Sequence, residues 1–188
     1  MTFLIRPYDG FTSRLREMAA RNASPRVLVE GPYGTTHLLD TFDDVLFIVG
    51  GSGIAVPLAY LSKLATSPHV RSVKIAWSVR EASLVTEVLQ RDMPNLLDSD
   101  KVSMDVFLTR GVAEDLEFED RPEKVCAVRG RPDVSAEIKC AAQGAMNGSL
   151  AVVACGPAVM ADDARRAVVE ILGEGYHRVE YFQEAFNW

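Results

Sequence analysis

A continuous apolar run followed at once by glycines is the feature that most constrains how this chain folds. Residues 45–49 read Val-Leu-Phe-Ile-Val, and Gly50-Gly51-Ser52-Gly53 comes next. Such a run is typical of a strand buried on both faces of a sheet. From 54 to 64 apolar residues recur at helical spacing, and Pro57 falls in the first turn, where a missing N–H is tolerated. This stretch predicts a strand, a glycine turn and a helix.

The same alternation continues along the chain. Strands are predicted at 72–79, 102–109, 125–128, 150–154 and 178–182, and helices at 82–97, 135–146 and 158–172. Strands separated by helices of about 10–15 residues form parallel β-α-β units. We therefore predict an α/β fold, a doubly wound and mostly parallel sheet of about five or six strands with helices on both faces. Ligands of such sheets bind beyond the carboxyl ends of the strands.

The first 34 residues depart from this pattern. They carry predicted strands at 3–5 and 27–29 and a helix at 12–21. This is too short for a domain. We interpret residues 1–34 as the end of one domain and residues 35–188 as another.

Composition excludes several functions. The net charge of −6 leaves no basic stripe for a nucleic acid. Three widely spaced cysteines share no metal-ligand spacing with the three histidines, so we expect no metal site and a reducing compartment. No apolar run reaches the roughly 20 residues of a membrane-spanning helix. We expect the chain by itself to be soluble and cytosolic.

The glycine cluster is the first of four junctions where a strand meets a helix and the residues indicate chemistry. Missing Cβ atoms and free N–H groups at such a junction favour an anion such as a pyrophosphate. The alternative is a tight turn with no ligand. Ser78 and Arg80 end the next strand, where a guanidinium suits a ribose 2′-phosphate. The alternative for Arg80 is an ion pair with a helix-side carboxylate such as Glu87.

Two further junctions follow later strands. Arg131 lies in Gly130-Arg131-Pro132-Asp133, which alternatively is a turn in which Asp133 caps a helix. Cys155-Gly156-Pro157 places a thiol at the rim, although such a cysteine is alternatively a small buried hydrophobe. Because all four junctions lie at the same end of parallel strands, we expect them to line one crevice.

In their order and spacing these junctions resemble the nucleotide-binding half of the ferredoxin-NADP reductase superfamily, and in particular the fungal ferric-chelate reductases, which are related to the NADPH oxidases. Ala55 stands where many of the oxidases carry threonine, which favours the reductase branch. The resemblance covers nearly the whole chain. It rests on Glu30-Gly31-Pro32-Tyr33-Gly34, Gly50-Gly51-Ser52-Gly53-Ile54, Trp77-Ser78-Val79-Arg80, Gly130-Arg131-Pro132, Cys155-Gly156-Pro157 and Phe186-Asn187-Trp188.

The resemblance implies cofactors and their contacts. In that family a membrane haem domain precedes a flavin-binding barrel and the NADPH domain; hydride passes from NADPH to FAD, and electrons pass through haem to ferric chelates at the plasma membrane. It implies that the glycine cluster holds the pyrophosphate, Ser78 and Arg80 the 2′-phosphate, and Arg131 a phosphate or ribose. The implied cofactor-binding residues are Gly31, Pro32, Tyr33, Gly34, Gly50, Gly51, Ser52, Gly53, Ile54, Ser78, Arg80, Arg131, Cys155, Gly156 and Pro157.

The residues implied for the hydride path are Cys155, Phe186 and Trp188. In the superfamily a terminal aromatic ring stacks on the flavin and yields to nicotinamide. Trp188 is the candidate for that ring, and Phe186 is the reserve. The alternative is that these aromatics close the edge of the core.

The resemblance also predicts what this chain lacks. The flavin motif of the family is absent, since Arg6-Pro7-Tyr8-Asp9 imitates it but ends in Asp9. We therefore expect a fragment with an incomplete FAD site, which in the full-length protein lies on the cytoplasmic face of a membrane. The predicted function is the NADPH-binding part of a ferric-chelate reductase. The alternatives are an NADPH oxidase-type domain and a nucleotide-binding module without activity of its own.

Overall fold

Two compact units make up the chain, residues 1–38 and 39–188. The computed structural model describes residues 5, 7, 9–28, 30, 36–93, 99–110, 123–145 and 148–184. In the first unit, α1 (Phe11–Ala20) confirms the helix predicted at 12–21, and none of its residues is buried.

The strand predicted at 27–29 is wrong for its two described residues. Val27 and Leu28 are exposed and lie outside any strand. A strand requires a hydrogen-bonded neighbour, and within the described part of the chain no residue pairs with these two. Ile5 is likewise outside any strand, and the rest of the strand predicted at 3–5 lies outside the described residues.

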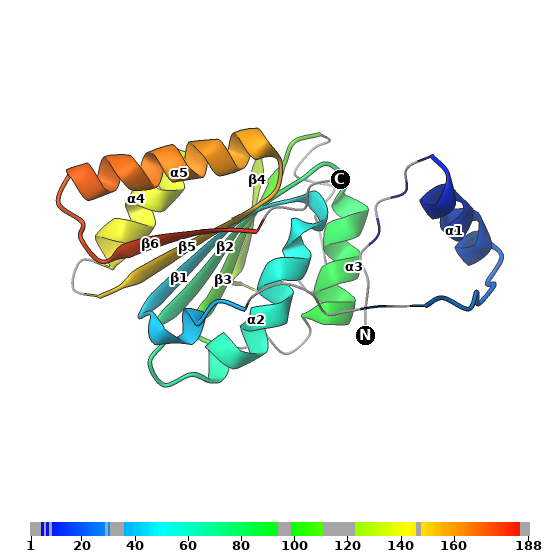
Figure 1. Ribbon diagram of the computed structural model, residues 1–188, viewed down its shortest axis with the longest axis horizontal. Helices are drawn as coiled ribbons and strands as arrows, with labels where there is room; N and C mark the ends of the chain where they lie inside the picture. The colour runs from blue at the N-terminus through cyan, green and yellow to red at the C-terminus, as the bar shows by residue number, and fades with distance from the viewer. Residues whose placement is uncertain are drawn as a thin grey trace. The chain divides into compact units, whose positions relative to one another are not determined.

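A six-stranded sheet forms the second unit, and every pair of neighbouring strands is parallel (Figure 1). All six strands predicted between residues 45 and 182 are confirmed. The chain builds the sheet outward from β1 to β4 and then crosses to the other side of β1 with β5, so the strand order reverses between β1 and β5. The strands, in the spatial order β4-β3-β2-β1-β5-β6, are β1 (Asp44–Gly50), β2 (Ser72–Val79), β3 (Val102–Leu108), β4 (Val125–Arg129), β5 (Leu150–Cys155) and β6 (Val179–Gln183).

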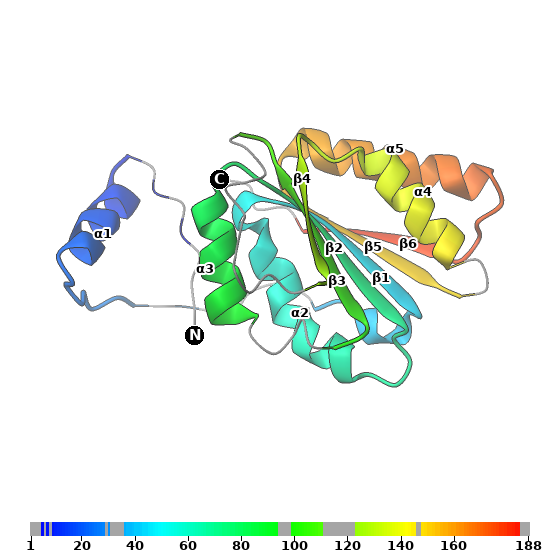
Figure 2. The same cartoon turned by 180° about the vertical axis from the view of Figure 1, so that it is seen from behind.

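Helices cover both faces of the sheet, as predicted (Figures 1 and 2). The pair α2 and α3 lies on one face and the pair α4 and α5 on the other. Their bounds are α2 (Ala55–Thr66), α3 (Ala82–Asp92), α4 (Val134–Gly144) and α5 (Ala158–Gly173), with short 3-10 helices η1 (Leu39–Thr41) and η2 (Gly51–Ile54).

One helix is shorter than predicted. The helix at 82–97 ends as α3 at Asp92 because Met93 precedes Pro94, and a residue before proline is driven out of the helical region. Residues 94–98 lie outside the described part.

Alternation along the strands divides the core into two layers. Towards α4 and α5 the sheet presents alternate residues such as Leu46, Ile48 and Ala76, which pack with the helices in one buried cluster. The helix side of this cluster is rich in alanine, which allows a close approach of helix and sheet: Ala142, Ala161, Ala164 and Ala167. The opposite face of β2 carries Val73, Ile75, Trp77 and Val79, all buried.

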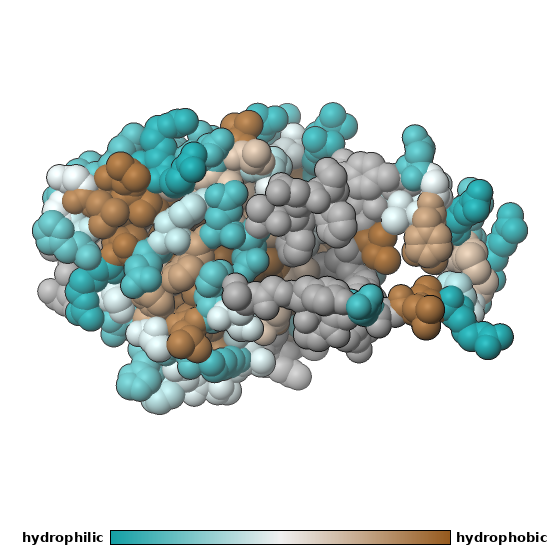
Figure 3. Space-filling view, viewed as in Figure 1, coloured by the Kyte–Doolittle hydropathy of each residue, from teal (hydrophilic) through white to brown (hydrophobic). Residues whose placement is uncertain are grey.

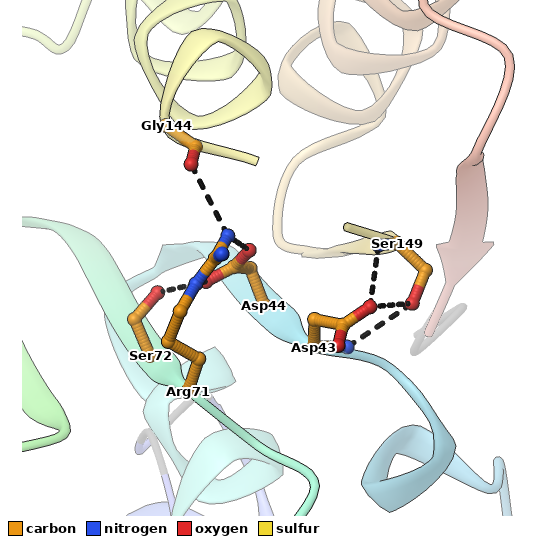
Figure 4. A network of polar contacts seen from close by, with 6 residues as sticks. All are labelled: Asp43, Asp44, Arg71, Ser72, Gly144 and Ser149. Carbon is orange, nitrogen blue, oxygen red and sulfur yellow. Dashed lines mark hydrogen bonds and ion pairs between the residues drawn. The ribbon is translucent and has the colours of Figure 1, made fainter. Parts of the chain in front are cut away.

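Two aspartates tie the amino end of β1 to its neighbours (Figure 4). Asp43 Oδ2 accepts hydrogen bonds from the backbone N–H of Ser149 at 2.7 Å and from its hydroxyl at 2.8 Å. Asp44 is 6% exposed and accepts from Ser72 Oγ at 2.6 Å and from the Arg71 guanidinium. Arg71 Nη2 also donates to Gly144 O at 3.1 Å, at the end of α4. These hydrogen bonds therefore stabilise the sheet at the amino ends of its strands, opposite to the carboxyl ends where a ligand is predicted to bind.

The outer surface carries apolar residues in separate small groups. On the face seen in Figure 3, brown residues are interspersed with teal ones among the parts that are coloured. Exposed apolar side chains of α5, such as Val159 and Val169, are of this scattered kind, which is ordinary for a protein surface. Within the described residues no helix is long and apolar enough to cross a membrane.

Candidate nucleotide-binding site

The predicted junctions meet where the strand order reverses. In the sheet register Gly50 of β1 lies beside Ser78 of β2, and Val49 lies beside Cys155 of β5. Three of the predicted segments therefore end neighbouring parallel strands. In open α/β sheets this is the position at which ligands bind.

Close packing explains most of the glycines at this point. A Cβ atom on Gly53 would lie 2.5 Å from Cys155 O, and one on Gly50 would lie 2.9 Å from Pro157 Cδ. A Cβ on Gly156 would lie 2.4 Å from Met160 Cε and 3.1 Å from Gly50 N. The turn after β1 and the turn after β5 are thus in direct van der Waals contact. The tight-turn interpretation accounts for these three glycines without a ligand.

Gly51 is different from its neighbours. Its φ is +55°, which only glycine adopts readily, and no atom lies within 4 Å of the position its Cβ would take. Ser52, the next residue, is exposed. Together they present open backbone at the start of η2 and α2, which suits the approach of an anion to free N–H groups.

A buried tryptophan supports this turn from inside. Trp77 is fully buried, and its Nε1 donates to Gly51 O at 2.9 Å. Ile54 is also fully buried, so its side chain anchors the turn in the core and only its backbone can face a ligand. This role of Trp77 was not predicted, because in the sequence a tryptophan within an apolar strand looks the same as a core residue.

Arg80 is exposed just after β2, and Ser78 is half-buried. The alternative, an ion pair of Arg80 with a helix-side carboxylate such as Glu87, is not found among the described residues, and Glu87 Oε1 instead accepts from Arg91 Nη1 at 2.9 Å within α3. Among the residues that the structure describes, Arg80 has no carboxylate partner. Its guanidinium is therefore not engaged by these residues.

The turn that contains Arg131 fits both of its interpretations. Asp133 Oδ1 accepts from Ala136 N at 3.0 Å and so caps α4, as the structural alternative predicted. Gly130 has a φ of +112°, and its N–H donates to Leu108 O at 2.8 Å. Arg131 itself is exposed, with no ion pair to any described residue.

Two more arginines lie at the same edge and were not found from the sequence. Thr109 donates to Val79 O both from its N–H at 2.9 Å and from its hydroxyl at 3.1 Å. Arg110 and Arg80 are the residues that follow Thr109 and Val79, so both lie at the carboxyl ends of these neighbouring strands. In the register of β3 and β4, Leu108 lies beside Arg129. The signal that could have found them is an arginine at or just beyond the end of each successive apolar strand.

The sequence profile of the ferric reductase NAD binding domain matches residues 42–169, which include the glycine turn and the junctions after β2, β4 and β5. This chain belongs to that family.

Full-length relatives of this ferric reductase NAD-binding domain are much longer. Ferric reductase transmembrane component 6 of Saccharomyces cerevisiae is 29% identical over 206 aligned residues, which cover 98% of this chain and 29% of that protein. Ferric/cupric reductase transmembrane component 1 of Candida albicans is 27% identical over 96% of this chain and 28% of that protein. The chain therefore spans less than a third of the length of these relatives.

Solved structures share the fold. The flavohemoglobin of Malassezia yamatoensis, determined with bound FAD and heme, has a TM-score of 0.58 and 22% identity over 97% of this chain and 43% of that one. The cytochrome b5 reductase domain of Ulva prolifera nitrate reductase has a TM-score of 0.50 and 15% identity over 74% of this chain and 48% of that one. The predicted ferredoxin-NADP reductase-like fold is confirmed.

Within this NAD-binding domain Cys155 is not the rim thiol that the sequence predicted. Its side chain is 1% exposed because it ends a central strand and packs under the glycine turn, with Sγ 3.2 Å from where a Gly53 Cβ would be. Burial, assisted by the charge of Glu184, raises the pKa of Cys155 to about 11. The thiol is therefore neutral near pH 7 and does not act as a thiolate there.

The remaining predicted residues lie outside the described part of the chain. These are Gly31, Pro32, Tyr33 and Gly34 before β1, and Phe186 and Trp188 at the end. The last described residue, Glu184, donates from its N–H to Ala154 O at 2.9 Å. It therefore lies at the carboxyl edge, beside the end of β5.

A hollow of about 280 Å³ between the start of α4 and the middle of α5 is a poor alternative site for a nucleotide. Its lining includes the carboxylates of Asp133, Asp163 and Glu170, and its one lining cation, Arg166, is paired with Asp163 at 3.1 Å. This surplus of negative charge disfavours a pyrophosphate. Among the described residues no cluster of three or more His, Cys, Asp or Glu side chains is placed to hold a metal ion.

Proposed function

We propose that this chain is the NADPH-binding part of a longer transmembrane ferric-chelate reductase that also contains flavin and haem. The observation that carries the proposal is the glycine turn at the point of strand-order reversal, where Gly51 leaves the backbone open. Membership in the ferric reductase NAD-binding family and the names of the relatives support the reductase assignment.

The open turn fits a dinucleotide phosphate. The backbone around Gly51 and Ser52 would bind the pyrophosphate, aided by the positive end of the α2 dipole. Ser78 and Arg80 would bind the 2′-phosphate, and Arg131 a further phosphate or the ribose. The absence of an acidic partner for either arginine among the described residues supports these roles.

The nicotinamide end of the cofactor would lie against the turn after β5. When bound, NADPH supplies a hydride and FAD accepts it. Gly156 and Pro157 would border the ring with backbone and apolar atoms, and the neutral Cys155 thiol beneath them would contribute packing. We propose that Gly31 to Gly34, Phe186 and Trp188 complete the flavin side, and that residues 1–34 are the end of a flavin-binding domain. In the whole protein this places the domain at the cytoplasmic face of a membrane.

Titration of the chain with NADPH and NADH tests this function. We expect both nucleotides to bind, NADPH more tightly, when dissociation constants are measured by calorimetry. Arg91→Ala is a suitable control because Arg91 pairs with Glu87 and Asp92 on α3, and it should leave both constants unchanged. Failure of the wild-type chain to bind either nucleotide would overturn the proposal.

A second candidate function is a nucleotide-binding module that catalyses nothing by itself. This candidate concerns the chain by itself, which spans less than a third of the length of its relatives. The two functions differ in a simple assay, the reduction of ferric citrate by NADPH after FAD is added. Turnover above the rate with free FAD would exclude the inactive module.

A further inference from the structure

Trp77 makes a hydrogen bond to the glycine turn that core packing alone does not require. It points from β2 towards the face of the sheet covered by α2 and α3, together with Ile75 and Val79. Its indole N–H is fully buried and therefore needs an acceptor. The acceptor is Gly51 O in the turn, 2.9 Å away, not a group of the sheet.

This bond fixes the direction of the following amide. The C=O of Gly51 and the N–H of Ser52 belong to one planar trans peptide, and they point in opposite directions. Because Trp77 holds the carbonyl towards the core, the Ser52 N–H must point away from the core. Ser52 is exposed and is the second residue of η2, where an N–H has no acceptor inside the helix.

The indole bond adds to the contacts that already hold this turn, which are the close packing of Gly50 and Gly53 and the buried side chain of Ile54. Gly51 adopts its φ of +55° without steric cost and has open space where a Cβ would be. Gly50, at the N-cap of η2, has no side chain that could form a cap. Among the described residues, the indole of Trp77 is the one side chain that donates a hydrogen bond to the Gly51 carbonyl.

We propose that Trp77 is a positioning residue for nucleotide binding, whose indole N–H holds the Gly51–Ser52 peptide so that the Ser52 N–H faces the pyrophosphate. Trp77 itself touches no ligand. This inference rests on the proposed function, because it assigns the role of a residue behind that same site.

Trp77→Phe tests the role, since it keeps an aromatic ring and removes the N–H. Dissociation constants are measured for NADPH, for ADP-ribose, which has the pyrophosphate, and for adenosine 2′-monophosphate, which lacks it. We expect the first two to weaken by about tenfold, as for the loss of a charge-assisted hydrogen bond, and the third to stay unchanged. Ile75→Val, two residues earlier on the same face of β2, is the control and should lower Tm without changing any of the three constants.

A second variant covers the case in which Trp77→Phe does not fold. Benzothienylalanine at position 77 keeps the bicyclic ring and replaces only the N–H by sulfur, and the same selective loss is expected. In ¹⁵N spectra the Ser52 amide should shift in this variant before any ligand is added.

Three results have distinct meanings. Equal weakening of all three ligands, or no weakening of any, would overturn the positioning role. Failure of the wild-type chain to bind NADPH would instead overturn the proposed function. Selective weakening of the two pyrophosphate ligands supports the role of Trp77.

Discussion

Substitution of the arginines at the ends of β2, β3 and β4 tests most directly which nucleotide this domain prefers. We expect Arg80→Ala to weaken NADPH binding about tenfold or more while NADH binding changes little, because a hydrogen bond to a charged group contributes about 1.5–3 kcal/mol and 1.4 kcal/mol is tenfold in affinity. Calorimetric titration of both nucleotides measures the difference. Equal losses for NADPH and NADH would rule out a 2′-phosphate contact.

Arg110, which lies at the same end of the sheet as Arg80, allows the effects of two arginines on nucleotide preference to be compared. It is exposed like Arg80, and no described carboxylate pairs with either. If the 2′-phosphate lies between the two strand ends, Arg110→Ala should show the same selectivity for NADPH to a smaller degree. Its position follows from the bonds of Thr109 to Val79 O.

Glycines of the domain should respond to substitution in opposite directions. Gly53→Ala would drive a Cβ to 2.5 Å from Cys155 O, and we expect a loss of about 1–3 kcal/mol in the free energy of unfolding, as for other overpacked sites. Gly144→Ala, at the end of α4, meets no atom within 4 Å and should stabilise by about 0.5–1 kcal/mol. Urea unfolding distinguishes them. Similar free energies of unfolding for Gly53→Ala and the wild type would show that the turns after β1 and β5 are not closely packed.

At the scale of elements, the six strands of the sheet were predictable and the contacts between turns were not. Apolar runs such as 45–49 and the alternation in 72–79 report burial, and burial identified the central strands, whereas β4 and β6 at the edges of the sheet are mostly not buried. The close contact between Gly53 and Cys155 depends on which strands become neighbours, and β1 and β5 are far apart in the sequence. For the same reason, neither the hydrogen-bond acceptor of Trp77 nor the burial of the Cys155 thiol could be predicted without the fold.

The amino ends of β1 and β5 are joined by a contact that depends on pH. Hydrogen bonds from the N–H and then the hydroxyl of Ser149 lower the pKa of Asp43 below its ordinary value of 3.8. A lowered carboxyl pKa contributes stability that is fully present above the unfolded pKa and is lost as the pH falls through the folded one. The contact should therefore hold from neutral pH down to about pH 4 and weaken below it.

A double-mutant cycle with Asp43→Ala and Ser149→Ala measures the part of this contact that the Ser149 hydroxyl makes, because the backbone N–H remains in the alanine variant. We expect the coupling free energy to be constant between pH 7 and 5 and to fall in more acid solution, with urea unfolding as the measurement. The exposed pair Arg165 and Asp162 on α5 serves as the control and should show coupling near zero. Coupling between Asp43 and Ser149 that persists unchanged at pH 3 would contradict the assignment of the charge.

At the scale of the whole molecule, the two units should differ in their importance for stability. No residue of α1 is buried, whereas the sheet and its four long helices hold the core. We expect a chain of residues 39–188 to unfold within about 2 °C of the Tm of the full sequence, since a loss below 1 kcal/mol shifts Tm by only a few degrees. Differential scanning calorimetry is the measurement. A much lower Tm would show that residues 1–38 contribute to the core.

The position of β1 between β2 and β5 has a consequence for synthesis of the protein. The partner of Asp44 on the β5 side is Leu150, and 150 − 44 = 106 residues separate them. At typical translation rates of about 5–20 residues per second, roughly 5–20 s pass between the emergence of the two strands. During that interval β1 to β4 can assemble, but one edge of the central strand β1 stays unpaired. The nascent chain therefore exposes a template for wrong pairing until its last third arrives, which makes this stage a natural point for a chaperone to act.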